Sequence, residues 1–255
     1  MCCGMLNADG WIDITKGKSR FMPRSGSSKA RIQEKGFFNI PMVIVVIVVV
    51  CLIAYIMPAY FMSFEEEEIF IITFGFIPAS FALDYSLITR MTAITYSFLH
   101  GSWIHLGLNM IWFIVFGSPL ANRLGVFLFL LFWVFTAIIA ALTHFLLYPD
   151  SDVALVGASG AISGLIGATA RYGFLHASGI HHSNRFEFAG PVLSIHTALQ
   201  SRTVVGFISG WLLLNVVIGA FPGEEEATIA WEAHIGGLFA GFLAISFFDR
   251  FSASS

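Results

Sequence analysis

Four polar side chains interrupt otherwise apolar stretches of the chain, and their residue types are those that acyl transfer requires. Ser159 lies in the run Gly157-Ala-Ser-Gly, where glycine lets the backbone turn tightly into a helix. A serine hydroxyl attacks well only when a neighbouring base removes its proton, and the neutral imidazole of His234 is the candidate base. The backbone N–H of Ser159 and the side chains of His105 and Asn109 are candidate donors to an oxyanion. His105 and Asn109 are four residues apart and therefore share one face of a helix.

Six apolar segments predict the elements that position these residues. Hydrophobic residues make up 57% of the 255 residues and charged residues only 11%, which is the composition of a membrane protein. A hydrocarbon layer roughly 30 Å thick needs about 20 apolar residues in a helix. We therefore predict an all-α, polytopic membrane domain over residues 37–250. Its six spans cover residues 40–63, 103–121, 125–147, 157–176, 203–221 and 229–248.

The basic residues assign a side of the membrane to each loop. Residues 1–36 are polar and rich in Lys and Arg, which predicts a flexible cytoplasmic tail followed by a retained anchor. Six spans then place the short tail 251–255 in the cytoplasm as well, in a membrane that we expect to be a bacterial inner membrane. The second, fourth and sixth spans all run inward, so the four polar residues meet at the outer end.

The segment 65–101 between the first two spans is too broken to cross a membrane. It begins with four consecutive Glu residues and contains Gly75, Pro78, Asp84 and Arg90 among apolar residues. An interfacial or re-entrant first outer loop fits this pattern.

Small residues at helix spacing predict a close approach of the fourth and sixth spans. Gly160 precedes Gly164 by four residues, and Gly237 precedes Gly241 in the same way. His234 shares a helix face with the second pair, so its side chain should point to where the two backbones meet. The same spacing is also common in helix packing that has no catalytic role.

Other polar residues are interpreted more simply. We expect His144 to be interfacial and Asn215 to form an interhelical hydrogen bond with no functional role. A solvated cluster, and not a metal site, is expected for the histidines in or beside the inner loop between the fourth and fifth spans. Three cysteines imply no disulfide framework, and acylation of the first two is only weakly indicated. These residues are His176, His181, His182, His196, Cys2, Cys3 and Cys51.

The sequence resembles the rhomboid family of intramembrane serine proteases between about residues 90 and 247. The resemblance rests on His100-Gly-Ser-Trp-Ile-His-Leu-Gly-Leu-Asn109, on Gly157-Ala-Ser-Gly160 and on Ala233-His-Ile-Gly-Gly-Leu-Phe-Ala-Gly241, in the order that the family has them. It implies a six-helix bundle that cleaves single-span membrane proteins near the outer face.

The resemblance also assigns roles to individual positions. It implies that Ser159 is the nucleophile and His234 the base and then the acid, with no third acidic partner. His105, Asn109 and the Ser159 amide would form the oxyanion site. His100 would organise the outer loop and a water-filled cavity, and Gly157, Gly160, Gly237 and Gly241 would support the dyad. A mobile gate would comprise the fifth span, with Phe207 and Trp211, and the cap 222–231.

Two departures from the family pattern concern neighbours of the site. Family members often have Trp-Arg in the first outer loop, where this chain has Thr89-Arg90. They also often have an aromatic residue four positions after the serine, where this chain has Ser163. The missing ring removes a stacking platform for His234, so we expect an altered histidine orientation or rate.

Three alternatives remain beside the protease. A catalytically silent rhomboid relative could bind or route membrane proteins, but it would usually lack the serine or the histidine. A channel or transporter could also use His and Asn inside the membrane, although repeat symmetry between the halves is missing. The sequence lacks the His-Glu-x-x-His motif of zinc intramembrane proteases, and it has no Asp in any predicted span, as an aspartyl protease would need. We expect neither metal nor organic cofactor and no nucleic-acid partner; the lipid bilayer is a partner, and the oligomeric state stays open.

Overall fold

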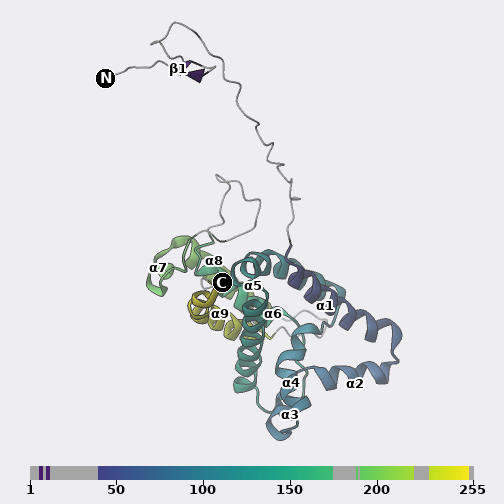
Figure 1. The fold of residues 1–255 in the computed structure, drawn as a ribbon. Coiled ribbons are helices and arrows are strands. Elements are labelled where there is room, and N and C mark those ends of the chain that lie inside the picture. The colour runs from purple at the N-terminus through teal and green to yellow at the C-terminus, as the bar shows by residue number, and fades with distance from the viewer. Residues whose placement is uncertain are drawn as a thin grey trace. The chain divides into compact units, whose positions relative to one another are not determined.

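The computed structural model describes residues 6–7, 10–11, 40–174, 188, 190–220 and 230–252 (Figure 1). The chain divides into two units, residues 1–35 and 36–255. In the first unit β1 (Leu6–Asn7) pairs antiparallel with β2 (Gly10–Trp11). The rest of the predicted N-terminal tail, the cap 222–229 and residues 253–255 lie outside the described residues.

Three described helices are long and apolar enough to cross a membrane. They are α1 (Met42–Phe61), α5 (Trp103–Leu147) and α9 (Trp231–Ser252). Helix α5 contains a break at Gly125, whose φ of 74° is not helical, and its two arms correspond to the predicted second and third spans. Glycine tolerates this left-handed backbone, which explains why the break falls there. The six-span count stays a prediction.

Two further apolar helices are shorter. Helix α6 (Ser159–Ala170) has 12 residues, and α8 (Arg202–Ala220) follows the short α7 (Ile195–Gln200). At 1.5 Å per residue α6 is only about 18 Å long. This helix is shorter than the fourth span predicted over 157–176. Residues 171–174 form turns in which Gly173 and Phe174 have positive φ, so the helix ends before them.

The first outer loop is built from short helices. These are α2 (Phe64–Phe74), α3 (Pro78–Leu83), α4 (Leu87–Thr95) and the 3₁₀ helix η1 (Tyr96–Phe98). Helix α2 begins with a capping box between Ser63 and Glu66, which places the Glu run in its first turns. Figure 1 shows α2, α3 and α4 on the opposite side of the bundle from α7 and α8.

Backbone hydrogen bonds join this loop to the segment that leads into α6. Phe76 and Leu155 exchange both of their bonds, at 3.1 and 2.8 Å. Ala79 N donates to Ser151 O at 3.1 Å, and Gly157 N donates to Tyr96 O at 3.0 Å. The residues just before Ser159 are thus held by the outer loop.

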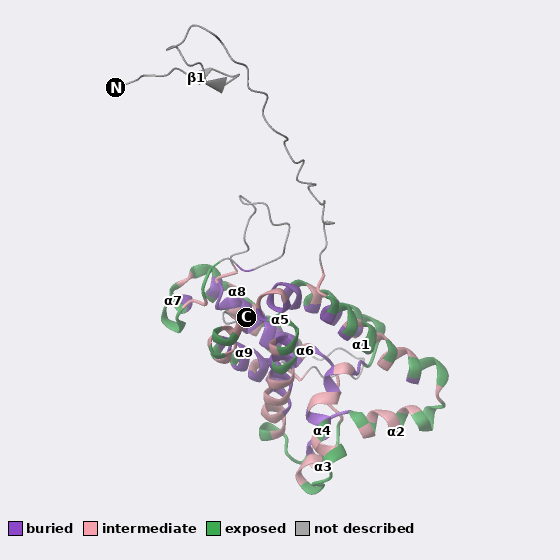
Figure 2. Ribbon diagram, viewed as in Figure 1, coloured by how far each residue is buried: buried purple, intermediate pink, exposed green. Residues whose placement is uncertain are grey.

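The core lies where α5, α6 and α9 pack together. Every residue of α6 from Gly160 to Ala170 is buried, and Figure 2 shows this helix at the buried centre of the bundle. A Cβ atom at Gly241 would lie 1.8 Å from Gly164 O, and one at Gly237 would lie 2.0 Å from Gly160 O. The backbones of α6 and α9 therefore touch, in what we call the glycine seam.

A polar cluster ties the far end of the seam. The Arg123 guanidinium donates to both carboxylate oxygens of Asp249, at 2.7 and 3.1 Å, and Tyr172 donates to Asp249 at 2.9 Å. Buried Arg171 donates to Phe242 O at 2.7 Å and to Leu193 O and Ser246 Oγ. These bonds anchor α9 to the end of α6.

Candidate active site

Ser159 and His234 are brought together across 75 residues of sequence. Ser159 is the first residue of α6, and His234 lies in the first turn of α9. The distance from Ser159 Oγ to His234 Nε2 is 2.6 Å, which is a hydrogen bond. His234 is buried, with 8% of its surface exposed. A serine hydroxyl paired with a buried imidazole is the arrangement that nucleophilic catalysis needs.

Glycines make the approach of the two helices possible. Gly157 has a φ of 124°, which only glycine adopts easily, and it directs the chain into α6. A Cβ at Gly160 would lie 2.7 Å from Ala140 Cβ, so this position admits no side chain. Gly160 and Gly237 face each other directly below the Ser159–His234 pair, as described for the seam.

The His105 ring packs against the turn that carries Ser159. A Cβ at Gly157 would lie 2.8 Å from His105 Nε2 and 3.7 Å from Ser159 Oγ. His105 is fixed in the first turn of α5, where Ser102 Oγ accepts a hydrogen bond from its backbone N–H at 3.1 Å. His105 therefore borders Ser159, with only a glycine between them.

Asn109 lies one turn further along α5 and is 5% exposed. Its Nδ2 atom is buried, with no hydrogen-bond partner among the described residues. A buried donor without a partner costs about 1–3 kcal/mol, so such a group calls for an explanation. An anion that forms only during a reaction would be a suitable acceptor for it.

His100 lies beside His105 rather than beside Ser159. The two imidazole rings meet edge to face, with 5.2 Å between their centres. His100 Nδ1 is 3.3 Å from Phe98 O, whereas Nε2 is buried without a partner among the described residues. A cavity of about 80 Å³ borders His100 and is lined by residues of α1, α2 and the segment 154–156.

Asn215 is the residue that the sequence analysis undervalued. Its predicted interhelical hydrogen bond is confirmed, but the partner is His234: Asn215 Oδ1 is bonded to His234 Nδ1. Asn215 Nδ2 donates to Trp211 O at 2.7 Å within α8. In the sequence, Asn215 is an amide in the middle of an apolar segment. Such a position indicates that the amide has a hydrogen-bond partner, but it does not identify the partner.

His144 and Glu232 form a second polar contact near the site. His144 Nδ1 lies 2.5 Å from Glu232 Oε1, with side-chain exposures of 12% and 4%. The interfacial interpretation of His144 was incomplete, because this ring is buried against a carboxylate at the start of α9. The pair fastens the first turn of α9, two residues before His234, to the end of α5.

Of the four histidines in or beside the inner loop, the structure describes only His196. His196 lies in α7, exposed and 3.4 Å from Gln200, and His176, His181 and His182 lie outside the described residues. Within the described ranges, no group of three His, Cys, Asp or Glu side chains could hold a metal ion.

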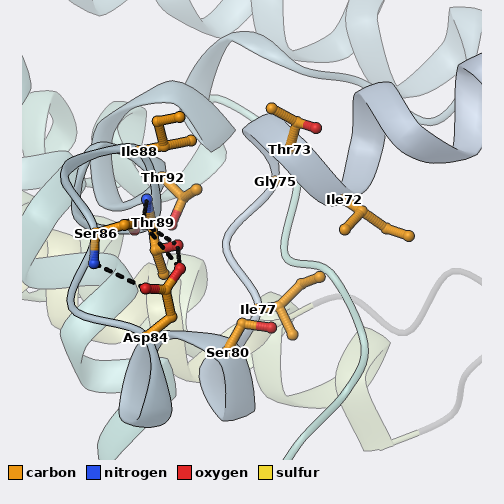
Figure 3. A pocket seen from close by; sticks show the side chains of 10 residues that line it. All are labelled: Ile72, Thr73, Gly75, Ile77, Ser80, Asp84, Ser86, Ile88, Thr89 and Thr92. Carbon is orange, nitrogen blue, oxygen red and sulfur yellow. Dashed lines mark hydrogen bonds between the residues drawn. The ribbon is translucent and has the colours of Figure 1, made fainter.

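A cavity of about 290 Å³ lies away from the site, between α2 and α4 (Figure 3). Its polar wall is Asp84, whose carboxylate accepts hydrogen bonds from Thr89 Oγ1 at 2.5 Å and from Ser86 N and Oγ at 2.8 Å. These hydrogen bonds hold the pKa of Asp84 below its usual value, and the bond from Thr89 has the largest effect. The carboxylate is thus used in capping α4.

The family of the chain follows from a comparison with protein-family models. The model of the rhomboid domain matches residues 89–250, which is more than half of the chain and includes every site residue described above. The chain belongs to the rhomboid family. No curated protein matches it. With its apolar helices, this rhomboid domain makes the chain an integral membrane protein.

Ser163 stands where members of the rhomboid family often have an aromatic residue, and the structure shows its surroundings. Ser163 is fully buried in α6, and its hydroxyl has no partner among the described residues. No aromatic ring of the described residues stacks on His234. The contact that the structure gives this imidazole instead is the amide of Asn215.

Proposed function

We propose that this rhomboid-family chain is an intramembrane serine endopeptidase that cleaves the membrane-spanning segments of single-span proteins near the outer membrane face. The observation that carries the proposal is the 2.6 Å contact between Ser159 Oγ and His234 Nε2, partly buried at the start of two touching helices. The same proposal places the protein in a bacterial inner membrane with both termini on the cytoplasmic side, as the basic residues indicate.

The chemistry uses one imidazole as base and then as acid, twice in each catalytic cycle. His234 Nε2 takes the proton of the Ser159 hydroxyl as Oγ forms a bond to the carbonyl carbon of the substrate. The protonated ring then gives this proton to the leaving amine nitrogen when the C–N bond breaks, which leaves an acyl-enzyme. Water, deprotonated by the same nitrogen, then attacks the ester carbon. The ring returns this proton to Ser159 Oγ as the ester C–O bond breaks, which releases the acid and the free serine.

The developing oxyanion needs donors that are already in position. The Ser159 N–H at the start of α6, the His105 ring beside Gly157 and the unpaired Nδ2 of Asn109 are suitable. Removal of one such donor typically slows acyl transfer by about 10² to 10³-fold. The unpartnered Asn109 amide, one helical turn after His105, supports the protease because it is free to donate to such an oxyanion.

The test is cleavage of a single-span reporter by the purified protein in liposomes. We expect Ser159→Ala and His234→Ala each to lower kcat by at least about 10⁴-fold, as is usual for a nucleophile and its base. Ser163→Ala is the matched control. It removes a buried, unpartnered hydroxyl one turn along the same helix and should leave kcat within about 2-fold.

Labelling by a fluorophosphonate probe separates the outcomes. Labelling of the wild type, lost in Ser159→Ala, supports an activated serine whatever the reporter. Cleavage that survives Ser159→Ala would contradict the mechanism. A folded wild type that neither cleaves nor reacts with the probe would favour the silent rhomboid relative.

A further inference from the structure

The hydrogen bonds of Asn215 decide which nitrogen of His234 carries the proton. A side-chain amide has one atom that donates and one that only accepts, and the two differ in their possible neighbours. The neighbour on one side is the carbonyl oxygen of Trp211, 2.7 Å away, which can only accept. The Asn215 NH₂ group must therefore face Trp211, and its carbonyl oxygen must face His234.

The orientation of the Asn215 amide in turn fixes the protonation of the His234 imidazole. Because Asn215 Oδ1 can only accept, His234 Nδ1 must carry a hydrogen in order to form this bond. A neutral imidazole has a single N–H, so Nε2 is left bare. Nε2 is the nitrogen that lies 2.6 Å from Ser159 Oγ. The Trp211 carbonyl, through Asn215, thus selects the tautomer in which His234 can accept the serine proton.

We propose that Asn215 is a positioning residue that makes His234 a competent base and ties that competence to the place of α8. This rests on the proposed function, since it names a third member of the same site. Asn215 is 6% exposed and lies on a different helix from both members of the dyad. If α8 moves away from α9, His234 loses the acceptor that fixes its tautomer, and the serine is no longer activated.

Helix α8 is the element of the site most able to make such a movement. Its glycines at 206 and 210 have nothing within 4 Å of where a Cβ would lie, so neither is at a backbone contact. Its contacts with α5 are between side chains: Trp211 with Trp112, and Phe207 with Phe116. Contacts of this kind can separate without disturbing the glycine seam.

The experiment combines ¹⁵N-histidine NMR of the protein in micelles with cleavage kinetics of the full chain. In the wild type we expect the neutral His234 ring to be protonated at Nδ1 and bare at Nε2. Asn215→Leu is close in size but has no acceptor. It should yield a mixture of tautomers and lower kcat by about 10- to 100-fold with KM within about 2-fold, since the wrong tautomer cannot accept from serine.

Two further variants separate positioning from folding. A neutral carboxylic acid offers one donor and one acceptor, so Asn215→Asp should restore the Nδ1–H tautomer and most of the kcat. Leu214→Ala, the exposed neighbour on α8, should change neither the tautomer nor kcat. If Asn215→Leu does not fold, the wild-type spectrum and these two variants still test the positioning role of Asn215.

The outcomes distinguish this proposal from the proposed function. A wild-type His234 protonated at Nε2, or an Asn215→Leu variant with wild-type tautomer and kcat, would overturn it. If the wild type proves inactive but its Nδ1–H tautomer is lost in Asn215→Leu, the protease fails and the positioning role of Asn215 stands.

Discussion

Two helices hold the residues that touch His234, and they contact α9 in opposite ways. Helix α6 meets α9 backbone to backbone, with carbonyl oxygens of Gly160 and Gly164 where side chains would otherwise be. Helix α8 meets α9 through side chains, with Asn215 bonded to His234 and Val204 in an apolar cluster with Phe242, and it meets α5 through aromatic rings. Ser159 is therefore placed by a backbone contact that leaves no room for a side chain, whereas the acceptor for His234 Nδ1 is placed by a side-chain contact.

This difference teaches how one site can be both precise and accessible. Ser159 and His234 need a fixed distance, which the seam provides at the cost of any side chain on its glycines. The membrane-embedded substrate that we propose needs an opening, and a helix held by side chains can move more readily than one held by its backbone. Four substitutions test this comparison, from the largest expected effect to the smallest.

Gly241→Ala should break the seam. The new Cβ would lie 1.8 Å from Gly164 O and 2.5 Å from Gly164 C, so the two backbones must separate. We expect a loss of about 3 kcal/mol or more in the free energy of unfolding, together with loss of cleavage. Reversible unfolding in mixed micelles would measure it, and a stability within 0.5 kcal/mol of the wild type, on the order of a surface substitution, would show that the seam can adjust.

Arg171→Met should loosen the far end of the seam. It leaves the carbonyls of Phe242 and Leu193 without their guanidinium donor. We expect a loss of about 2–4 kcal/mol in the free energy of unfolding, because buried acceptors lose a charged partner. Arg202→Met is the control, since this arginine at the start of α8 is exposed. Equal effects of the two variants would argue against an anchored end.

Phe207→Ala should act on α8 alone. The ring packs on Phe174, with centres 4.5 Å apart, and on Phe116. We expect a loss of only about 1 kcal/mol, because lipid can fill part of the space that an aromatic contact leaves. The same unfolding assay applies. A loss as large as that of Gly241→Ala would mean that α8 is as integral as α6 and would remove the contrast.

Gly210→Ala should have the smallest effect. Nothing lies within 4 Å of the new methyl group, and alanine favours a helix over glycine. We expect the free energy of unfolding to stay within about 0.5 kcal/mol or to rise by up to about 1 kcal/mol. A clear destabilisation, measured beside Gly241→Ala, would reveal a close contact on α8 that the comparison denies.

The sequence predicted the parts of the site that depend on local chemistry. Ser159, His234 and the paired glycines stand out because hydrocarbon penalises polar groups and because close helices need small residues. The structure brings these residues together as their spacing indicates. The family resemblance adds their order along the chain, and the domain match over 89–250 supports it.

The features that the sequence did not predict depend on how each helix is rotated about its axis and on where it ends. The partner of Asn215 follows from the rotation of α8 about its axis, which an apolar segment does not encode. The pairing of His144 with Glu232 joins residues 88 positions apart. The early end of α6 follows from turns at Gly173 and Phe174, which hydropathy alone continues through. In each case the decisive contact lies outside the local pattern.

The four backbone hydrogen bonds between the first outer loop and the segment 151–157 act as a mechanical coupling. They run from Phe76, Ala79 and Tyr96 to the residues immediately before Ser159. A displacement of the loop would be passed by these bonds to the chain that leads into α6. The position of Ser159 is thereby linked to the position of the first outer loop.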